Sequence, residues 1–151
     1  MEQYIVSDIE EVVHCMFRNV VSCFSSDDTL FIEKINQNIR IVYSSKRASV
    51  LPSDLTGMEL HLSLDAKEIW ISSLHVAVPF RSTGIGRQLV HAAEEVARVI
   101  EFETINVLPV NASQSFWLKM GYRPHRCTAK VLSKSVNPHR HEHTLALADC
   151  L

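Results

Sequence analysis

The chain has 151 residues, a length typical of one domain, and its 46% hydrophobic and 21% charged residues are ordinary for a globular protein. A formal net charge of −2 gives no basic footprint for nucleic acid, and no apolar run reaches the roughly 18 residues of a membrane span. Residues 1–8 lack the basic and apolar blocks of a signal peptide, so we expect a cytoplasmic protein that binds neither nucleic acid nor a membrane.

Cysteine usage predicts a reduced protein without a disulfide framework. The four cysteines are Cys15, Cys23, Cys127 and Cys150. None belongs to a C-x-x-C pair, and their wide spacing argues against both disulfides and a structural zinc site. We expect small, buried, apolar side chains, with a single reactive thiol as the alternative.

The first part of the chain predicts two helices, a strand and a loop. Residues 7–10 have the spacing of a capping box, and apolar residues then recur at helical spacing, so a helix is expected over 8–24. Polar capping residues predict a second, short helix over 25–37. The β-branched segment Ile39–Ser44 predicts a strand, with a helical continuation as the alternative. The polar segment Lys46–Gly57 predicts a loop.

The rest of the chain alternates between strands and helices. Residues 58–64 alternate between apolar and polar, which predicts a half-buried strand, and 68–78 is apolar on both faces, as in a central strand. The later elements are a helix over 85–100, a strand over 104–108, a helix over 113–120 and a hairpin of 126–133 with 141–147. This order predicts an α/β or α+β fold in one domain over 1–151. Its single mixed, mostly antiparallel sheet would have six to seven strands and about four flanking helices.

The strongest local signal is the junction Leu74–Arg87, where a strand runs through a loop into a helix. A helix start leaves backbone N–H groups without partners and carries the positive end of the helix dipole, so it attracts a phosphate. Gly84 and Gly86 keep side chains away from that position, and Arg81 can add a charge-assisted hydrogen bond. Leu89 replaces the third glycine of a dinucleotide-binding fingerprint, and no P-loop lysine follows, so both motifs are excluded. The spacing alone fits an ordinary helix start equally well.

Two segments together resemble the GNAT family of N-acetyltransferases. Arg81-x-x-Gly84-x-Gly86 resembles the family's motif A, and Phe116–Tyr122 is similar to its motif B. The resemblance covers about residues 58–147, whereas the first 57 residues match only in the order of elements, with 4–6 as a reduced first strand. It implies a GNAT-like acyl-CoA N-acyltransferase fold with acetyl-CoA as cosubstrate, an amine as acceptor and dimerisation through the last strands.

The resemblance also implies a set of cofactor contacts. These fall on Leu74, Val76, Ala77, Val78, Arg81, Ser82, Thr83, Gly84, Ile85, Gly86, Arg87, Asn111, Ser113 and Phe116. By analogy, the strand residues offer backbone groups to pantetheine and 81–87 cradle the pyrophosphate. Asn111 and Ser113 are alternatives for one contact, because the interval to Gly121 is one residue short. Phe116 either packs near the cofactor arm or belongs to the core.

The implied reaction is the attack of an amine on the thioester of acetyl-CoA. The resemblance assigns the Val76 amide to the developing oxyanion. The family's glutamate lies on the strand face of Trp70, Ser72 and Leu74, where this chain offers only Ser72, which can hold a water. Trp117 replaces the tyrosine that commonly acts as the acid, and Tyr122 is the nearest remaining hydroxyl.

Other ionisable residues are weaker candidates for chemistry. Strand alternation puts His75 on the face opposite Ser72, so it is expected to be a packing histidine, and Glu68 is expected to be a solvated turn residue. The histidines near the end of the chain alternate along one strand face. They are His139, His141 and His143. A solvated edge strand is favoured over a metal site, so no metal is expected.

Two alternatives to an enzyme stay open. The first is a non-catalytic module of the same fold that binds or senses acyl-CoA, and the missing carboxylate and tyrosine favour it. The second is an interaction protein in which the glycines only begin a helix.

Overall fold

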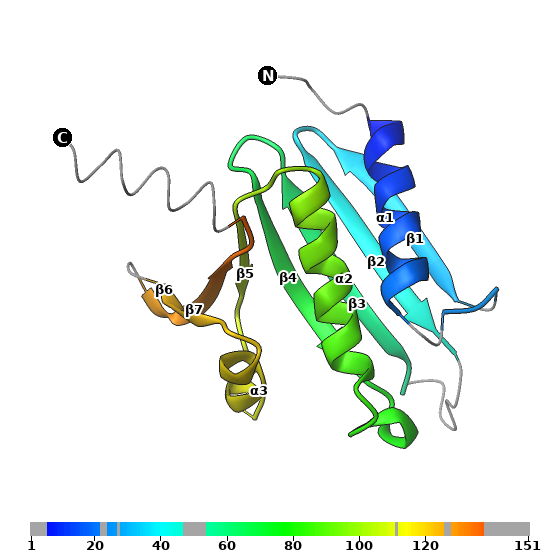
Figure 1. Ribbon diagram of the computed structural model, residues 1–151, viewed down its shortest axis with the longest axis vertical. Coiled ribbons are helices and arrows are strands. Elements are labelled where there is room, and N and C mark those ends of the chain that lie inside the picture. The colour runs from blue at the N-terminus through cyan, green and yellow to red at the C-terminus, as the bar shows by residue number, and fades with distance from the viewer. Residues whose placement is uncertain are drawn as a thin grey trace.

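The computed structural model describes residues 6–21, 24–26, 28–46, 54–110, 112–125 and 128–137. The elements are α1 (Val6–Val20), β1 (Thr29–Ile35), β2 (Asn38–Ser45), β3 (Thr56–Ser63), β4 (Glu68–His75), η1 (Val78–Phe80), α2 (Ile85–Val99), β5 (Thr104–Val107), α3 (Gln114–Lys119), β6 (Arg123–His125) and β7 (Thr128–Ser135). The seven strands form one sheet in the order β1-β2-β3-β4-β5-β7-β6 (Figure 1).

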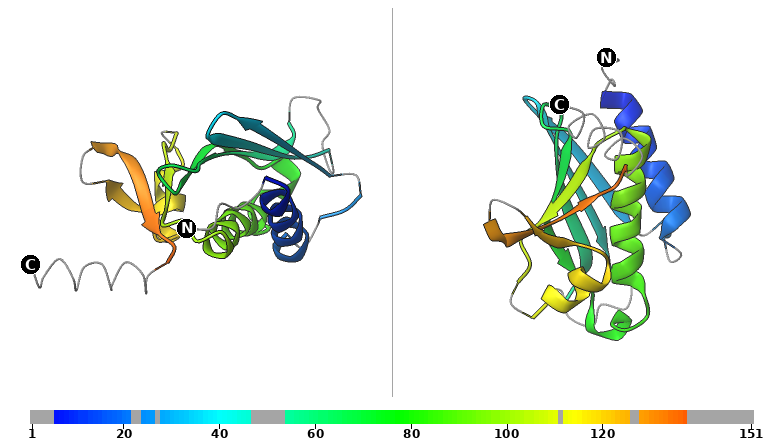
Figure 2. Two further views of the ribbon diagram at one scale, coloured as in Figure 1. Left: turned by 90° about the horizontal axis from the view of Figure 1, so that it is seen from above. Right: turned by 60° about the vertical axis from the view of Figure 1, so that its left-hand side comes forward.

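The sheet is mixed, because β4 and β5 are parallel whereas every other neighbouring pair is antiparallel. Helices α1 and α2 lie side by side on one face of the sheet, and α3 lies beside the β5–β7 end (Figure 2). The predicted mixed sheet of six to seven strands is therefore confirmed. The described residues form three α-helices and one 3₁₀ turn, compared with the four helices expected. None of the described helices is long and apolar enough to span a membrane.

The core lies between the sheet and the two long helices. Alternate residues of β2, β3 and β4 point toward the helices, and α1 and α2 each turn one apolar stripe toward the sheet. Fully buried members include Ile9, Val13 and Phe17 of α1, Leu89, Ala93 and Val96 of α2, and Ile41, Leu60 and Ile69 of the sheet. This packing fixes the N-terminal end of α2 next to the end of β4.

The prediction of a second helix over 25–37 is wrong, because β1 occupies most of that segment. Leu30 and Ile32 pack against the core while Phe31 is 54% exposed, so the apolar pattern has the period of a strand. Asn36 has a φ of 56° in the tight turn that joins β1 to β2. Asparagine tolerates this left-handed conformation well, which favours a hairpin over a helix here.

Several predicted boundaries also change. Helix α1 begins at Val6 and ends at Val20, short of the expected 8–24. The last two residues of the expected loop 46–57 belong to β3, because they pair with the end of β2. The expected strand 68–78 ends at His75, and Pro79 lies in the 3₁₀ turn that follows.

The C-terminal hairpin differs in its partner strands. Strand β7 covers most of the expected strand 126–133, but it pairs with β6 and β5. The expected strand 141–147 lies outside the described residues, as do the three histidines near it and residues 4–5.

Cys15 contradicts the expectation of buried cysteines. It is exposed on α1, where Asn19 Nδ2 donates a hydrogen bond to its sulfur over 3.4 Å. The buried stripe of α1 runs through Ile9, Val13 and Phe17, and Cys15 lies on another side of the helix. The other three cysteines lie outside the described residues.

Candidate active site

A cleft opens where β4 and β5 part. The two parallel strands pair from Glu68 opposite Thr104 to Ile71 opposite Val107, where β5 ends, whereas β4 continues to His75. The cleft encloses about 410 Å³, including space open to solvent. It is lined by Ile71, Ser72, Ser73, Leu74, Val107, Leu108, Pro109, Val110, Ser113, Phe116 and Trp117. On the side that β5 has left, the second half of β4 can therefore offer its backbone groups to a ligand.

A β-bulge at Ser72 changes the faces of the strand residues that follow it. Leu60 pairs with Ile71, but the preceding Glu59 pairs with Ser73, so Ser72 is an extra residue in β4. The bulge turns Ser73 and His75 onto the face that carries Glu59, and returns the half-buried Leu74 to the helix face. Simple alternation, which put His75 on the opposite face, is therefore wrong here.

His75 is not the packing histidine that was expected. Its side chain is 48% exposed, and Nε2 lies 2.8 Å from Oδ1 of Asp54. The other carboxylate oxygen of Asp54 accepts a hydrogen bond from the Val78 amide at 2.9 Å. These two contacts, with His75 the larger influence, hold the pKa of Asp54 below its usual value. Asp54 thus ties the segment before β3 to the end of β4.

The loop before α2 holds two residues in the left-handed region, Ser82 with φ 66° and Gly84 with φ 89°. Gly84 is the N-cap of α2, and a Cβ on it would meet no atom within 4 Å, so the space above it is open. A Cβ on Gly86 would lie 3.4 Å from Val76 Cγ2 and 3.8 Å from Phe116 Cζ. Gly86 therefore lets the strand end and α3 approach the helix, while the first-turn amides have no acceptor inside the helix.

The backbone between β4 and α2 is already partly engaged within the protein. The Ala77 amide donates to Thr56 Oγ1 at 2.9 Å, and the Val78 amide donates to Asp54. Arg81 is exposed, and its Nε donates to the Val76 carbonyl at 3.1 Å. Any cofactor contact at Ala77 or Val78 would therefore use groups other than their amides.

Three of the residues singled out in the sequence line the cleft on the side of α3, and a fourth lies outside the described residues. Ser113, Phe116 and Trp117 line it, and the rings of Phe116 and Trp117 meet edge to face with centroids 5.1 Å apart. The Ser113 hydroxyl donates to the Val110 carbonyl at 2.9 Å. Asn111 lies outside the described residues.

Tyr122 lies in the core and does not line the cleft. The residue is fully buried, and its hydroxyl has no hydrogen-bond partner among the described residues. Burial, followed by the charge of Glu94, raises the pKa of Tyr122 far above its usual value. Its ring packs edge to face against Trp117, so Tyr122 supports the cleft wall from behind.

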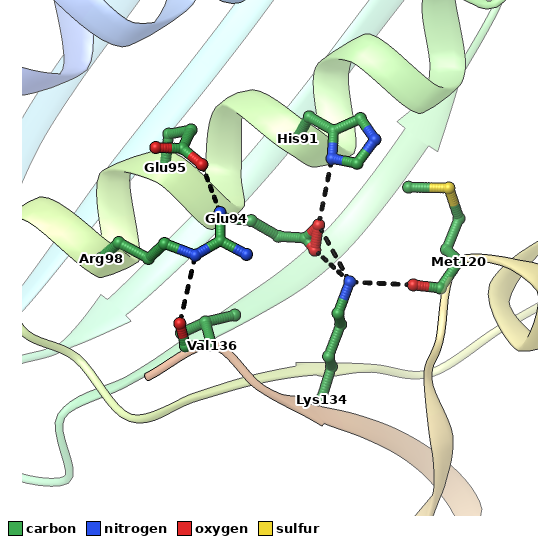
Figure 3. A network of polar contacts seen from close by, with 7 residues as sticks. All are labelled: His91, Glu94, Glu95, Arg98, Met120, Lys134 and Val136. Carbon is green, nitrogen blue, oxygen red and sulfur yellow. Dashed lines mark hydrogen bonds and ion pairs between the residues drawn. The ribbon is translucent and has the colours of Figure 1, made fainter. Parts of the chain in front are cut away.

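A partly buried ion pair attaches this wall to α2 (Figure 3). The side chain of Glu94 is completely buried, and Lys134 Nζ of β7 lies 2.9 Å from its Oε2. Lys134 also donates to the Met120 carbonyl at 2.9 Å, and His91 Nδ1 lies 3.3 Å from Glu94 Oε1. Because Lys134 neutralises the buried charge of Glu94, the network holds β7 and the end of α3 against α2.

Sequence reasoning missed the carboxylate beside the cleft, Glu59 of β3. The Ser72 hydroxyl donates to Glu59 Oε2 at 3.0 Å, while Arg40 Nη2 lies 2.6 Å from Oε1. Partial burial favours the neutral form of Glu59, but hydrogen bonds from Arg40, His61 and Ser72 outweigh it and keep its pKa below the usual value. The polar face of β3 was visible in the sequence, but the strand register that puts Glu59 beside Ser72 was not.

Glu68 is held by side chains and is not the solvated turn residue that was expected. Its two carboxylate oxygens accept hydrogen bonds from Trp70 Nε1 at 3.2 Å and from Asn106 Nδ2 at 3.0 Å. The buried Asn106 also accepts one from Ser133 at 2.6 Å. Among the described residues, no group of three His, Cys, Asp or Glu could hold a metal ion.

Comparisons with known proteins point to one family. The model of the Acetyltransferase (GNAT) family matches residues 42–122, more than half of the chain. No curated protein matches the sequence.

Two solved structures illustrate the likeness of the fold. Tetrahymena GCN5 has a TM-score of 0.52 at 11% identity, and the match covers 88% of this chain and 89% of that one. The KacTA–DNA complex has a TM-score of 0.50 at 13% identity, with coverages of 74% and 76%. Such low identities show the fold alone, whereas the family model covers both the cleft and the loop that precedes α2. The chain belongs to the GNAT family of acetyltransferases, a family that uses acetyl-CoA.

Proposed function

We propose that this protein is an acetyl-CoA-dependent N-acetyltransferase that moves the acetyl group to a primary amine of a small molecule or peptide. The observation that carries the proposal is the position of the cleft. It opens along the half of β4 that β5 has left, and β4 leads directly into the loop and the N-terminal end of α2. A ligand with a diphosphate and an extended arm suits this site. The amides at the N-terminal end of α2 can bind the diphosphate, and the open edge of β4 can bind the arm.

The proposed binding mode uses each part of this junction separately. The amides of Ile85, Gly86 and Arg87 face the pyrophosphate, and the Arg81 and Arg87 side chains add positive charge. The exposed edge of β4 supports the pantetheine arm. The amide of Val76, one residue past β4, donates to the thioester oxygen as negative charge develops there.

The chemistry then needs no covalent intermediate on the protein. The acceptor loses a proton to water, and its nitrogen attacks the thioester carbon. The carbon–sulfur bond breaks, the nitrogen loses a second proton and keeps one as the amide N–H, and the CoA thiolate takes up a proton. The protein contributes mainly orientation in the cleft and a preorganised hydrogen bond to the oxygen.

A second candidate is a module of the same fold that binds acyl-CoA without turnover. The absence of a carboxylate from the cleft-lining residues of β4 favours it, as does Trp117 in place of a tyrosine. An assay for the free thiol of CoA over a panel of primary amines separates the two candidates. Thiol release that depends on the amine supports the enzyme, whereas CoA binding without release supports the module.

The position of the pyrophosphate is tested by Gly84→Trp. The space above Gly84 is open, so the indole would occupy the proposed phosphate position without entering the core. We expect calorimetry to show loss of CoA binding, while thermal unfolding shows a folded protein.

Gly84→Ala is the matched control, because it imposes the same strain at φ 89° without the bulk. It should keep measurable CoA affinity. Unchanged CoA affinity in Gly84→Trp would show that the pyrophosphate does not bind at this loop.

A further inference from the structure

The last residue of β4 is a histidine on the open face of the sheet. The bulge at Ser72 turns His75 onto the face that α1 and α2 do not cover (Figure 2). The residue opposite His75 on β3 is Gly57, which has no side chain to crowd the imidazole. The His75 side chain is 48% exposed, so a ligand on this face can contact it.

Asp54 fixes the orientation and the tautomer of this imidazole. One carboxylate oxygen lies 2.8 Å from His75 Nε2, and the other accepts the Val78 amide at 2.9 Å, so Asp54 is itself held in place. An ionised carboxylate only accepts hydrogen bonds, so Nε2 must carry a hydrogen. The lone pair of the neutral ring is then on Nδ1, which has no hydrogen-bond partner among the described residues. Nδ1 can therefore accept a proton.

Two further charges lie near this pair. Arg81, in the loop before α2, acts on Asp54 through its charge, and Glu59 of β3 lies on the same sheet face, opposite Ser73. Within the described part of the chain, however, Asp54 makes the only polar contact with the imidazole. Asp54 is therefore the group that chiefly decides how well a positive charge on His75 is stabilised.

The proposed cofactor position determines from which side the acceptor approaches. The diphosphate would bind at the N-terminal end of α2, on the helix face of the sheet, so the opposite face is left for the acceptor. His75 lies on that opposite face and directly precedes Val76, whose amide would face the thioester oxygen. Glu68, the other titratable residue of β4, is at the far end of the strand. His75 is therefore the titratable residue of β4 nearest to the attacking nitrogen.

We propose that His75 is the general base of acetyl transfer and that Asp54 is its positioning residue. The inference rests on the proposed function and adds a catalytic residue to the same site. Once the nitrogen has attacked, its second N–H bond breaks, the bonding electron pair stays on the nitrogen, and the proton bonds to the lone pair of His75 Nδ1. Asp54 stabilises the imidazolium, which passes its proton to solvent because the ring is half exposed. The CoA thiolate takes its proton from water.

The test replaces His75 with a side chain that keeps the contact to Asp54 but is not a base. The amide of His75→Gln can still donate to Asp54, but it cannot take up a proton. With the amine that the wild type acetylates fastest, kcat should fall about 100-fold, as for a lost general base, while the KM for acetyl-CoA changes little. Added imidazole should restore part of kcat in His75→Ala, because the truncated side chain leaves room for it.

The pH profile of kcat separates a base from a structural histidine. In the wild type, kcat should rise with pH near neutrality as the imidazole loses its proton. His75→Gln should lose this rise. Asp54→Asn keeps an oxygen for the Val78 amide but loses the charge that stabilises the imidazolium, so the rise should move to lower pH.

His61→Gln is the matched control. His61 is also a partly exposed histidine beside a carboxylate, with Nε2 3.3 Å from Glu59, and it lies on β3 on the same sheet face. Its kcat should stay within about twofold of the wild type and keep the rise near neutrality. Calorimetry with CoA separates this inference from the proposed function, since the His75 and His61 variants should bind CoA as the wild type does.

Three results would overturn the inference: an unchanged kcat in His75→Gln, a rise near neutrality that survives in that variant, or equal losses in His75→Gln and His61→Gln. A protein that binds CoA but transfers acetyl to no amine would also overturn it, in favour of the non-catalytic module. Failure to bind CoA at all would overturn the proposed function itself.

Discussion

The two halves of β4 have different neighbours. The first half, Glu68–Ile71, pairs with β3 on one side and β5 on the other, and its apolar residues Ile69 and Ile71 are buried. The second half, Ser72–His75, pairs with β3 alone, contains the bulge and lines the cleft with three of its four residues. The half of β4 that is paired on both sides therefore belongs to the core, whereas the half that is paired on one side only lines the cleft.

The cleft between β4 and β5 can stay open while the sheet around it remains intact. The sheet continues on both sides of it, through β3 and through β7, and the ion pair of Glu94 with Lys134 holds the far wall against α2. A ligand can therefore use the unpaired edge of β4 without the sheet having to open.

The largest expected effect is a loss of stability when a buried residue is truncated in the first half of β4, which is paired on both sides. Ile69→Ala removes a completely buried side chain, so the free energy of unfolding should fall by about 2–5 kcal/mol, measured by chemical denaturation. The CoA affinity of the folded protein should not change. The matched variant Leu74→Ala alters a half-buried, cleft-lining residue of the second half, and it should cost less stability but more CoA affinity. The reverse order would show that the two halves do not divide these roles.

The next largest effect is expected when the β-bulge at Ser72 is removed. Deleting Ser72 would leave every other residue of β4 opposite its present partner on β3, because Ser72 is the extra residue. The variant should fold, but it should lose about 100-fold in acetyl transfer, because the strand edge moves relative to the cleft. Ser72→Ala keeps the bulge and removes only the hydroxyl, so it should lose less activity. A deletion no worse than Ser72→Ala would mean that the bulge does not shape the site.

The smallest effect concerns pH. The folded-state pKa of Glu59 lies below its unfolded value of about 4.5. Its contribution to stability is therefore present above that value and is lost as the pH falls through the lower, folded pKa. We expect the stability difference between the wild type and Glu59→Gln to be largest near about pH 7 and to shrink in acid. Denaturant unfolding at several pH values measures this difference, and one that grows in acid would contradict the cited pKa direction.

Local patterns in the sequence were enough to place much of the fold. β-Branched content located β2, alternation located β3, a run that is apolar on both faces located β4, and the 3.6-residue period located α2. Gly84 and Gly86 marked the start of α2, and Gly84 adopts the left-handed φ that glycine favours. The same reasoning failed at 25–37, where polar residues that can cap a helix preceded a strand whose alternation was short.

The sequence by itself determined the family, the order of most elements and the strand–loop–helix junction. Only the tertiary structure decided which residues face one another across that junction. Glu59 and Ser72 are 13 positions apart, and their contact depends on the register of β3 against β4 and on one inserted residue. A one-residue change of register moves every later side chain to the other face, and register is set by packing between strands, so no local pattern could have revealed this pair.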